Sequence, residues 1–424
     1  MDLFFKKLKL VFSDRVLLKR IGFLLLGLAI FRLLAAIPVP SVNPIQLEQF
    51  FQDNQLLSFL NIFSGGGLSS LSIVMLGVGP FITASIVMQL LTIVFPSIKS
   101  MYQEEGDIGR KKFTQYARLL TVPFAAVQGF SFLFLLQNQG VIEPLTTMGI
   151  VVNLSIIIAG SLLLTWLGEL MTEFGVGNGM SILIFAGIIA SLPTTLSQLV
   201  FTFDPSQIPL YITFAIAAIL VTYGVVVMTE AERSVPVTYA RAGRPGAQTT
   251  GAVSTYLPLR VNQAGVMPII FALSILLFPQ LILNFLSQAN IGVVSSLAQT
   301  LTTLPYGQVI YGLFYFFLVF LFTFFYTAIT FDPTRMADNL QKSGAFVPGV
   351  RPGTQTAEYL GRIVTRITLL GAVFLGAVAV LPLIMQGLTG FTALAIGGTA
   401  LLIVVSVVLD ILRKVDAQVS LREY

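Results

Sequence analysis

The residues of this sequence that could do chemistry are few, and their types exclude most catalytic classes. The 424 residues include no cysteine and no histidine, so the usual ligands of zinc, haem, iron–sulfur and blue-copper centres are missing. Ser–His and Cys–His nucleophilic catalysis is excluded for the same reason. There is also no HExxH motif and no pair of mid-span aspartates for an intramembrane protease. We therefore expect no enzyme, no catalytic residue, no metal site and no cofactor.

Two segments rich in arginine, glycine and proline offer a different chemistry. ARAGRPG at 240–246 carries Arg241 and Arg244, and GAFVPGVRPG at 344–353 carries Arg351. Glycine and proline favour protruding turns, and guanidinium groups on such turns can pair with anionic surfaces. Two interpretations stay open: the arginines only orient the chain in a membrane, or they form a docking surface for a large acidic cytoplasmic partner.

A glycine run follows a short apolar stretch near the N-terminus. The stretch 56–63 is too short to span a bilayer, and Ser64 and three glycines follow it. The run is not a phosphate loop, because no Gly-Lys-Ser/Thr follows. A short apolar segment of this kind either lies on the membrane surface or folds back into a helix bundle. From the residues alone, the surface position is favoured.

The composition requires most of the chain to lie in lipid. It is 55% hydrophobic and 10% charged, whereas soluble domains carry about 25% charged residues. Breaking the apolar stretches at charges and at Pro/Gly clusters predicts ten transmembrane helices of roughly 20 residues each. These spans are 21–37, 71–95, 119–136, 150–167, 180–199, 209–228, 265–285, 309–331, 363–385 and 393–412.

The charge distribution supports this count. Every lysine and arginine except Arg32 falls in, or within four residues of, a segment that the ten spans place on one side of the membrane, and the charged residues of the opposite side are all acidic. The positive-inside rule then places both termini in the cytoplasm. Arg32 lies near the outer end of the first span, where it snorkels to the interface or pairs inside the bundle. The basic segment 1–20 is either an amphipathic surface helix or a solvated leader.

The ten spans divide into two halves, which we place at 21–199 and 200–412, followed by a cytoplasmic tail at 413–424. The first half begins with a long external loop, whereas the long loops of the second half, about 229–264 and 332–362, are cytoplasmic. The strings GVGPFI (77–82) and GVMPII (265–270) occupy the same place in each half. Five plus five helices with inverted topology explain both features, although chance similarity of two Gly/Pro kinks is the alternative.

Ionisable residues are nearly missing at mid-membrane depth. Apart from Arg32, they collect at span ends, which leaves Thr, Ser, Gln and Asn as the polar groups inside the spans. A proton relay or a cation site would need buried carboxylates. The pattern therefore disfavours the main alternative function, a secondary transporter with inverted repeats, without excluding it.

Seven strings spread along the chain resemble the SecY/Sec61-alpha family of protein-conducting channel subunits, in family order. They are IFSGG (62–66), QLLT (89–92), WLGE (166–169), GNGMS (177–181), LPLRVN (257–262), ADNL (337–340) and GAFVPGVRPG (344–353). The resemblance implies an all-α integral membrane protein whose ten transmembrane helices form two inverted five-helix halves, a clamshell around a central hourglass pore. It also implies that unfolded preproteins cross through the pore and that transmembrane segments leave it sideways.

The resemblance implies further that a ring of aliphatic side chains closes the pore. Carried over by position, the ring residues are Val78, Ile82, Met180, Ile184, Ile270 and Ile403. Family members mostly carry isoleucine there, so Val78 and Met180 depart in shape while staying apolar. From the residues alone, these six would be ordinary packing residues.

A plug and a lateral gate complete the implied channel. The plug falls on about 57–70, which reverses the surface interpretation above; its marked residues are Leu60, Ile62, Phe63, Gly65 and Gly66. The gate opens between the second and third spans on one side and the seventh and eighth on the other. Pro80 and Pro268 kink its two faces, and a hydrogen bond between Gln89 and Asn262 is expected to hold it shut.

The resemblance also names partners and a location. The partners are SecE and SecG subunits, the SecA motor ATPase, a translating ribosome, and preprotein signal sequences and nascent chains, with membrane insertase and accessory Sec components as further candidates. Arg351, with Arg241 and Arg244, is expected to dock the motor or ribosome. The location is the bacterial cytoplasmic (inner) membrane. Many relatives carry an arginine after the glutamate corresponding to Glu173, and this chain does not, so no contact of the fourth-to-fifth loop is carried over.

Overall fold

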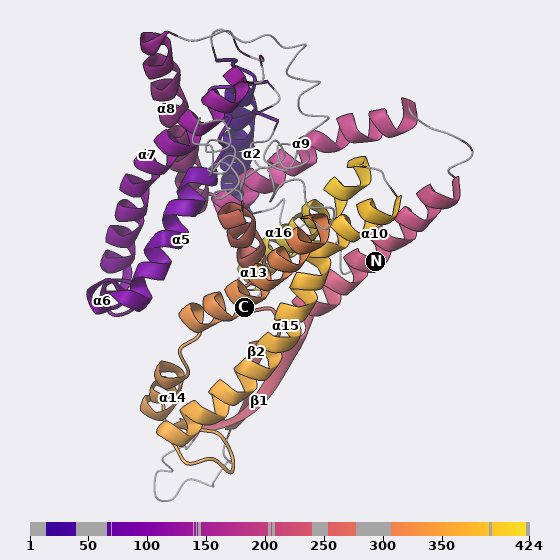
Figure 1. Cartoon of the computed structure of the whole chain (residues 1–424). Helices are drawn as coiled ribbons and strands as arrows, with labels where there is room; N and C mark the ends of the chain where they lie inside the picture. The colour runs from indigo at the N-terminus through magenta and orange to yellow at the C-terminus, as the bar shows by residue number, and fades with distance from the viewer. Residues whose placement is uncertain are drawn as a thin grey trace, which may run out of the picture.

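A computed structural model of the whole chain describes residues 14–39, 66–68, 70–138, 140, 142, 146–201, 205, 208–239, 253–276, 307–389 and 392–420. Two groups of long helices lie side by side, with the N-terminal group in indigo to magenta and the C-terminal group in magenta to yellow (Figure 1). The N-terminal half contains α2 (Arg15–Ala35), α5 (Gly79–Val94), α6 (Pro96–Gln103), α7 (Gly106–Asn138), α8 (Thr147–Phe174) and α9 (Gly179–Phe201).

The C-terminal half adds a small sheet to its helices. Its helices are α10 (Ile208–Glu230), the short helix Met267–Leu276, α13 (Gly307–Thr330), α14 (Pro333–Lys342), α15 (Thr354–Thr389) and α16 (Thr392–Ser420). Its strands are β1 (Glu232–Tyr239), β2 (Val253–Arg260) and β3 (Ala345–Phe346).

Each of the ten predicted spans contains a helix, which confirms the helical membrane architecture. Among the described residues, five helices are long and apolar enough to cross a bilayer, or six when the bent pair α5 and α6 counts as one span. The first span, α2, is not among these helices, and its 21 residues include four basic ones, Arg15, Lys19, Arg20 and Arg32. Arg32 is exposed in the last turn of α2, where a cation also interacts favourably with the helix dipole.

The second span begins later than predicted, at Gly79 instead of residue 71. Residues 70–78 form irregular turns that are held to the end of the first span, because the Val39 N–H donates to the Leu71 carbonyl at 2.7 Å and the Ile73 N–H donates to the Ile37 carbonyl at 3.0 Å. Gly160 of α8 packs so closely on this segment that a Cβ would overlap the Ile73 carbonyl oxygen. Backbone that is not helical is therefore buried in protein and shielded from lipid.

The two similar strings adopt the same local structure. Gly77 and Gly265 both have a positive φ, of 58° and 62°, a region that glycine enters without strain. A helix begins two residues later in each string, with proline in its first turn. The Ile82 N–H donates to the Val78 carbonyl, and the Ile270 N–H donates to the Val266 carbonyl in the same way. This correspondence supports the inverted repeat over chance similarity.

The main hydrophobic core draws on both halves. It brings side chains of α2, α5, α8 and α9 together with those of Met267–Leu276, α13, α15 and α16. A second core, built from Leu68, Leu71, Met75 and residues of α7 and α8, belongs to the N-terminal half alone. The two halves therefore share one apolar centre.

A three-stranded antiparallel sheet lies beyond the membrane helices. The prediction of an all-α protein with ten transmembrane helices did not include this sheet. β1 pairs with β2 along their whole length, from Glu232 opposite Arg260 to Tyr239 opposite Val253, and β3 pairs with the end of β1. Val235 and Val237 of β1 point inward and pack with Leu259 and the start of α15. The sheet thus has a small core of its own, and Figure 1 shows β1 and β2 along α15 at the lower end of the molecule.

Candidate functional site

The six residues expected to ring the pore lie in one apolar cluster. Val78, Ile82, Ile184, Ile270 and Ile403 are all at most 7% exposed, and Met180 packs against them partly buried. They come from α5 and the residue that precedes it, α9, the helix Met267–Leu276 and α16, so both halves contribute. The structure brings the six residues together, which their separation in sequence does not require. Their role as a seal remains a proposal.

The motif GNGMS positions Met180 at the start of α9. Asn178 caps the helix, because its side-chain oxygen accepts a hydrogen bond from the Met180 N–H at 3.0 Å and its backbone carbonyl accepts one from the Ile182 N–H at 3.0 Å. Gly177 has a φ of 99°. Gly179 packs directly on α8, where a Cβ would overlap the Gly168 carbonyl oxygen. The spacing of this motif therefore fixes where α9 enters the cluster.

An aliphatic cluster of this kind can do one thing chemically, which is to exclude water. It offers neither a nucleophile nor a fixed polar partner, and a narrow apolar constriction blocks ions by dewetting. Among the described residues, no Asp, Glu, Lys or Arg is buried; the buried polar groups are uncharged and belong to serine, threonine and asparagine, with the Tyr315 hydroxyl and the Gln89 side-chain oxygen. The site is therefore suited to closing a path and not to binding an ion.

The polar pair expected at the gate does not form its hydrogen bond. The side-chain oxygens of Gln89 and Asn262 are both buried, and neither accepts a hydrogen bond in the structure. A bond between two amides needs one of these oxygens as its acceptor, so the expected contact is absent. Asn262 lies just after β2, and Gln89 lies in the second half of α5. Only the two prolines of the expected gate, Pro80 and Pro268, occupy matching helix starts.

The expected plug lies mostly outside the described residues. Leu60, Ile62, Phe63 and Gly65 are in this category, and Gly66 is described in a turn with a φ of 81°. The next residues pack into the N-terminal half: Leu68 belongs to the core with α7 and α8, and the Ser70 hydroxyl donates to the Ala35 carbonyl at 2.9 Å. The described end of this segment is thus anchored beside α2.

Arg351 is exposed on a loop whose backbone is firmly held. Gly349 and Gly353 have φ values of 80° and 96°, which explains the glycine spacing of the motif. The Thr356 hydroxyl donates to the Arg351 carbonyl at 2.9 Å, and Val347 and Val350 pack into the core of the sheet. Arg241 and Arg244 lie outside the described residues, in the segment 240–252 that follows β1.

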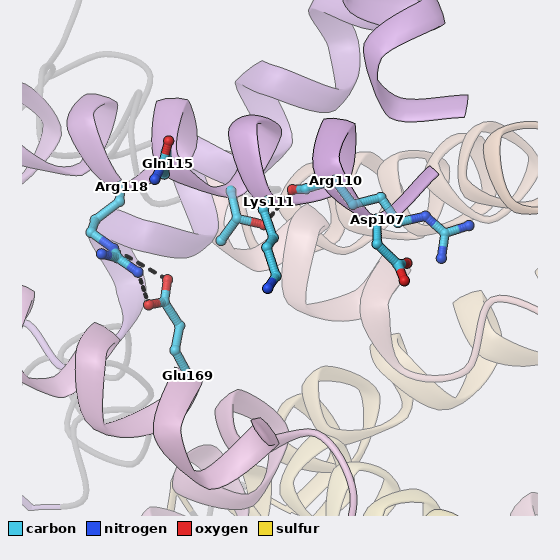
Figure 2. Close-up of a pocket in the computed structure, with 7 residues that line it drawn as sticks. Asp107, Arg110, Lys111, Gln115, Arg118 and Glu169 are labelled. Carbon is cyan, nitrogen blue, oxygen red and sulfur yellow. Dashed lines mark hydrogen bonds and ion pairs between the residues drawn. The ribbon is translucent and has the colours of Figure 1, made fainter. Parts of the chain in front are cut away.

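A polar hollow of about 480 Å³ lies at the end of α7 that faces α6. Figure 2 shows Arg118 turned toward Glu169 of α8, with Lys111 and Arg110 along the same helix. The Arg118 Nε donates to Glu169 at 3.3 Å, and its Nη2 also pairs with this carboxylate. The hollow shares no residue with the apolar cluster, so the two are separate features.

Sequence reasoning missed one residue of the apolar cluster and the β1–β2 strand pair. Val266 occupies the position in GVMPII that Val78 occupies in GVGPFI, and it is 7% exposed in the same cluster. The repeat itself was the signal. For the β1–β2 hairpin, the signal was the alternation of Val235 with Val237 and of Leu257 with Leu259 on either side of a Gly/Pro/Arg turn.

Comparison with known proteins gives consistent matches along the chain. The family model described as SecY matches residues 72–412. A protein translocase subunit SecY of Aquifex aeolicus is 38% identical over 429 residues, covering 98% of each chain. A solved structure described as "The structure of a protein conducting channel" has a TM-score of 0.65 at 20% identity, covering 94% of this chain and 91% of that one. "Sec61 in the Canine ribosome-channel complex from the endoplasmic reticulum" has a TM-score of 0.62 at 19% identity, with the same coverage.

Proposed function

The chain belongs to the SecY family of protein translocase subunits, and from that membership we propose that it forms the pore through which unfolded preproteins cross a membrane. It is a multi-pass membrane protein and a channel subunit, not an enzyme. The same pore releases hydrophobic segments sideways into lipid. We take the membrane to be the bacterial cytoplasmic membrane, with both termini in the cytoplasm.

The observation that carries this proposal is the apolar cluster shared by the two halves. A channel that passes every polypeptide sequence cannot offer fixed polar partners to the chain, yet it must stop ions when idle. An aliphatic ring of Val78, Ile82, Met180, Ile184, Ile270 and Ile403 meets both demands. Methionine is flexible, so Met180 makes this side of the ring more deformable than an isoleucine would. The segment at about 57–70 would act as the second barrier.

A secondary transporter with inverted repeats is the alternative, and one observation weighs against it. Such a protein couples transport to ions or protons through buried ionisable groups. In the part of the chain that the structure describes, no such group is buried. Uptake of a small solute driven by an ion gradient across vesicles that contain only this protein would favour the alternative.

The cytoplasmic sheet and the Arg351 loop form the proposed docking surface for the partner that drives transport. The sequence contains no Gly-Lys-Ser/Thr phosphate loop, so the energy comes from that partner, either a SecA motor ATPase or a translating ribosome. The structural neighbour in a canine ribosome–channel complex supports the ribosome. SecE and SecG subunits, insertase and accessory Sec components complete the proposed assembly.

Reconstitution tests the function. The purified protein is placed in lipid vesicles with its small partner subunits, and protease protection of a preprotein is measured. We expect protected preprotein only when SecA and ATP are both present. Vesicles that lack the chain, and vesicles with a non-hydrolysable nucleotide, are the controls. Absence of protected preprotein with a motor that is active on another translocase would contradict the proposal.

A further inference from the structure

Arg335 joins the two halves through a polar contact far from the apolar cluster. It lies on α14 of the C-terminal half, and its Nη1 donates to the backbone carbonyl of Gln103, at the end of α6 in the N-terminal half, at 2.6 Å. Its Nη2 lies 3.9 Å from the carboxylate of Glu104. One guanidinium therefore holds two groups at the end of α6. A charge-assisted hydrogen bond of this kind is stronger than a neutral one.

The arginine is held firmly on its own side. Asp332 caps α14 by accepting hydrogen bonds from the Thr334 and Arg335 N–H groups, and its carboxylate lies 3.7 Å from the Arg335 Nε. Pro333 begins the helix, which packs on α15 and β3. Met336 and Leu340 of α14 also pack against the core of the sheet. The guanidinium thus projects from a rigid base.

The acceptor is equally well held. α6 follows α5 after a bend of 113°, and its Met101 and Tyr102 pack against Phe113 of α7 and Met88 of α5. The Glu104 and Glu105 N–H groups both donate to the Ser100 carbonyl, which closes the end of the helix. α6 therefore moves with α5 and α7 as one unit, and a pull on Gln103 acts on both of those helices.

The Arg335 contact joins helices that are connected to the two opposite faces of the proposed gate. α5 and α7 belong to one face of the proposed gate, and α14 follows directly after α13, which belongs to the other. Any separation of these faces at the end where α6 and α14 lie must break the Arg335 contacts. The amides that were expected to hold the gate, Gln89 and Asn262, do not bond to each other. Arg335 thus supplies a polar link between the helices on the two sides of this opening.

We propose that Arg335 is a positioning residue that latches the gate and so sets how hydrophobic a signal segment must be to open it; this inference rests on the proposed channel function. A strongly hydrophobic segment gains enough from lipid to break the latch, whereas a weakly hydrophobic one does not. Removing the guanidinium lowers the hydrophobicity that a signal segment needs to open the gate. Transport of a preprotein with a strongly hydrophobic signal segment stays unchanged.

A distance measurement tests the latch directly. Because the chain has no cysteine, Ser97→Cys on α6 and Asn339→Cys on α14, both at exposed positions, take spin labels without side reactions. In lipid nanodiscs, Arg335→Ala is expected to lengthen and broaden the label-to-label distance distribution. Gln103→Ala is expected to leave it unchanged, because the acceptor is a backbone carbonyl. Arg362→Ala removes an exposed arginine paired within α15 and is the matched control.

A transport measurement tests the threshold. A series of preproteins whose signal sequences contain progressively fewer leucines is offered to the reconstituted channel. Arg335→Ala is expected to raise transport of the weakest signals by about threefold to tenfold, and Arg335→Gln is expected to behave similarly. An unchanged distance distribution, or an unshifted threshold in both variants, overturns the latch. If the unaltered protein transports no member of the series with an active motor, the channel function fails instead.

Discussion

Asparagine in place of Ile82 or Ile403 is expected to make the idle channel leak ions. Both side chains are buried in the cluster that joins the two halves, at 7% and 1% exposure. An amide there gives water a hydrogen-bonding partner inside an otherwise apolar constriction, which stabilises a wetted state by about 1–3 kcal/mol. Ion conductance across a planar bilayer, without preprotein, should therefore rise on the order of tenfold or more.

The channel's selectivity for functional signal sequences should also relax in these variants, because a wetted ring opposes opening of the channel less than a dry one does. Preproteins with defective signal sequences are expected to cross more readily. Ile157→Asn is the matched control: Ile157 is fully buried, but in the core that belongs to the N-terminal half alone. That variant loses stability without opening the ring. Idle conductance equal to that of the unaltered protein in both ring variants would remove these residues from the seal.

Glutamate in place of Arg351 is expected to reduce motor-driven transport at least about tenfold, as loss of an interface hot spot does. The residue is exposed on a loop fixed by Gly349, Gly353 and Thr356, so a partner meets the guanidinium already in position. Reversing its charge places a carboxylate against the acidic surface that the guanidinium is proposed to bind. SecA-dependent protease protection of a preprotein, measured over a range of SecA concentrations, gives the loss.

Assembly should be unaffected in this variant, because Arg351 contributes no side chain to the core of the sheet. Equal yield of protein associated with its small partner subunits checks this point. Arg362→Glu reverses an exposed charge on the adjoining helix α15 and serves as the control for a general electrostatic effect. Transport at the unaltered rate in Arg351→Glu, or an equal loss in both variants, would remove Arg351 from the docking surface.

Much of the architecture was predictable because lipid imposes strong rules on sequence. Apolar length and charge asymmetry place the helices, so all ten spans contain one. The paired strings GVGPFI and GVMPII predicted the repeat, and the matching φ angles of Gly77 and Gly265 now support it. Residues 71–78 were assigned to a helix because hydropathy cannot distinguish a helix from buried irregular backbone. The Gly160 contact that accommodates this segment depends on tertiary packing.

Contacts between distant polar residues were the least predictable. Gln89 and Asn262 are both amides in suitable places, yet their oxygens are left without partners. The contact that does join the halves pairs Arg335 with a backbone carbonyl, and a carbonyl is present at every position whatever its side chain. The strands β1 and β2 were not predicted, because each has only a short apolar alternation and contains a proline, Pro236 or Pro258, which weakens the signal for a strand.

The most direct test asks whether a polypeptide passes through the aliphatic ring. The chain has no cysteine, so Ile82→Cys, at the ring, and Leu220→Cys, which is 64% exposed on α10, each supply a single thiol. A preprotein with one cysteine is stalled midway by a folded domain at its C-terminus, and an oxidant is added. The account predicts a disulfide to Ile82→Cys and none to Leu220→Cys. Equal cross-linking at both positions, or none at Ile82→Cys while the stalled preprotein is protected, would contradict it.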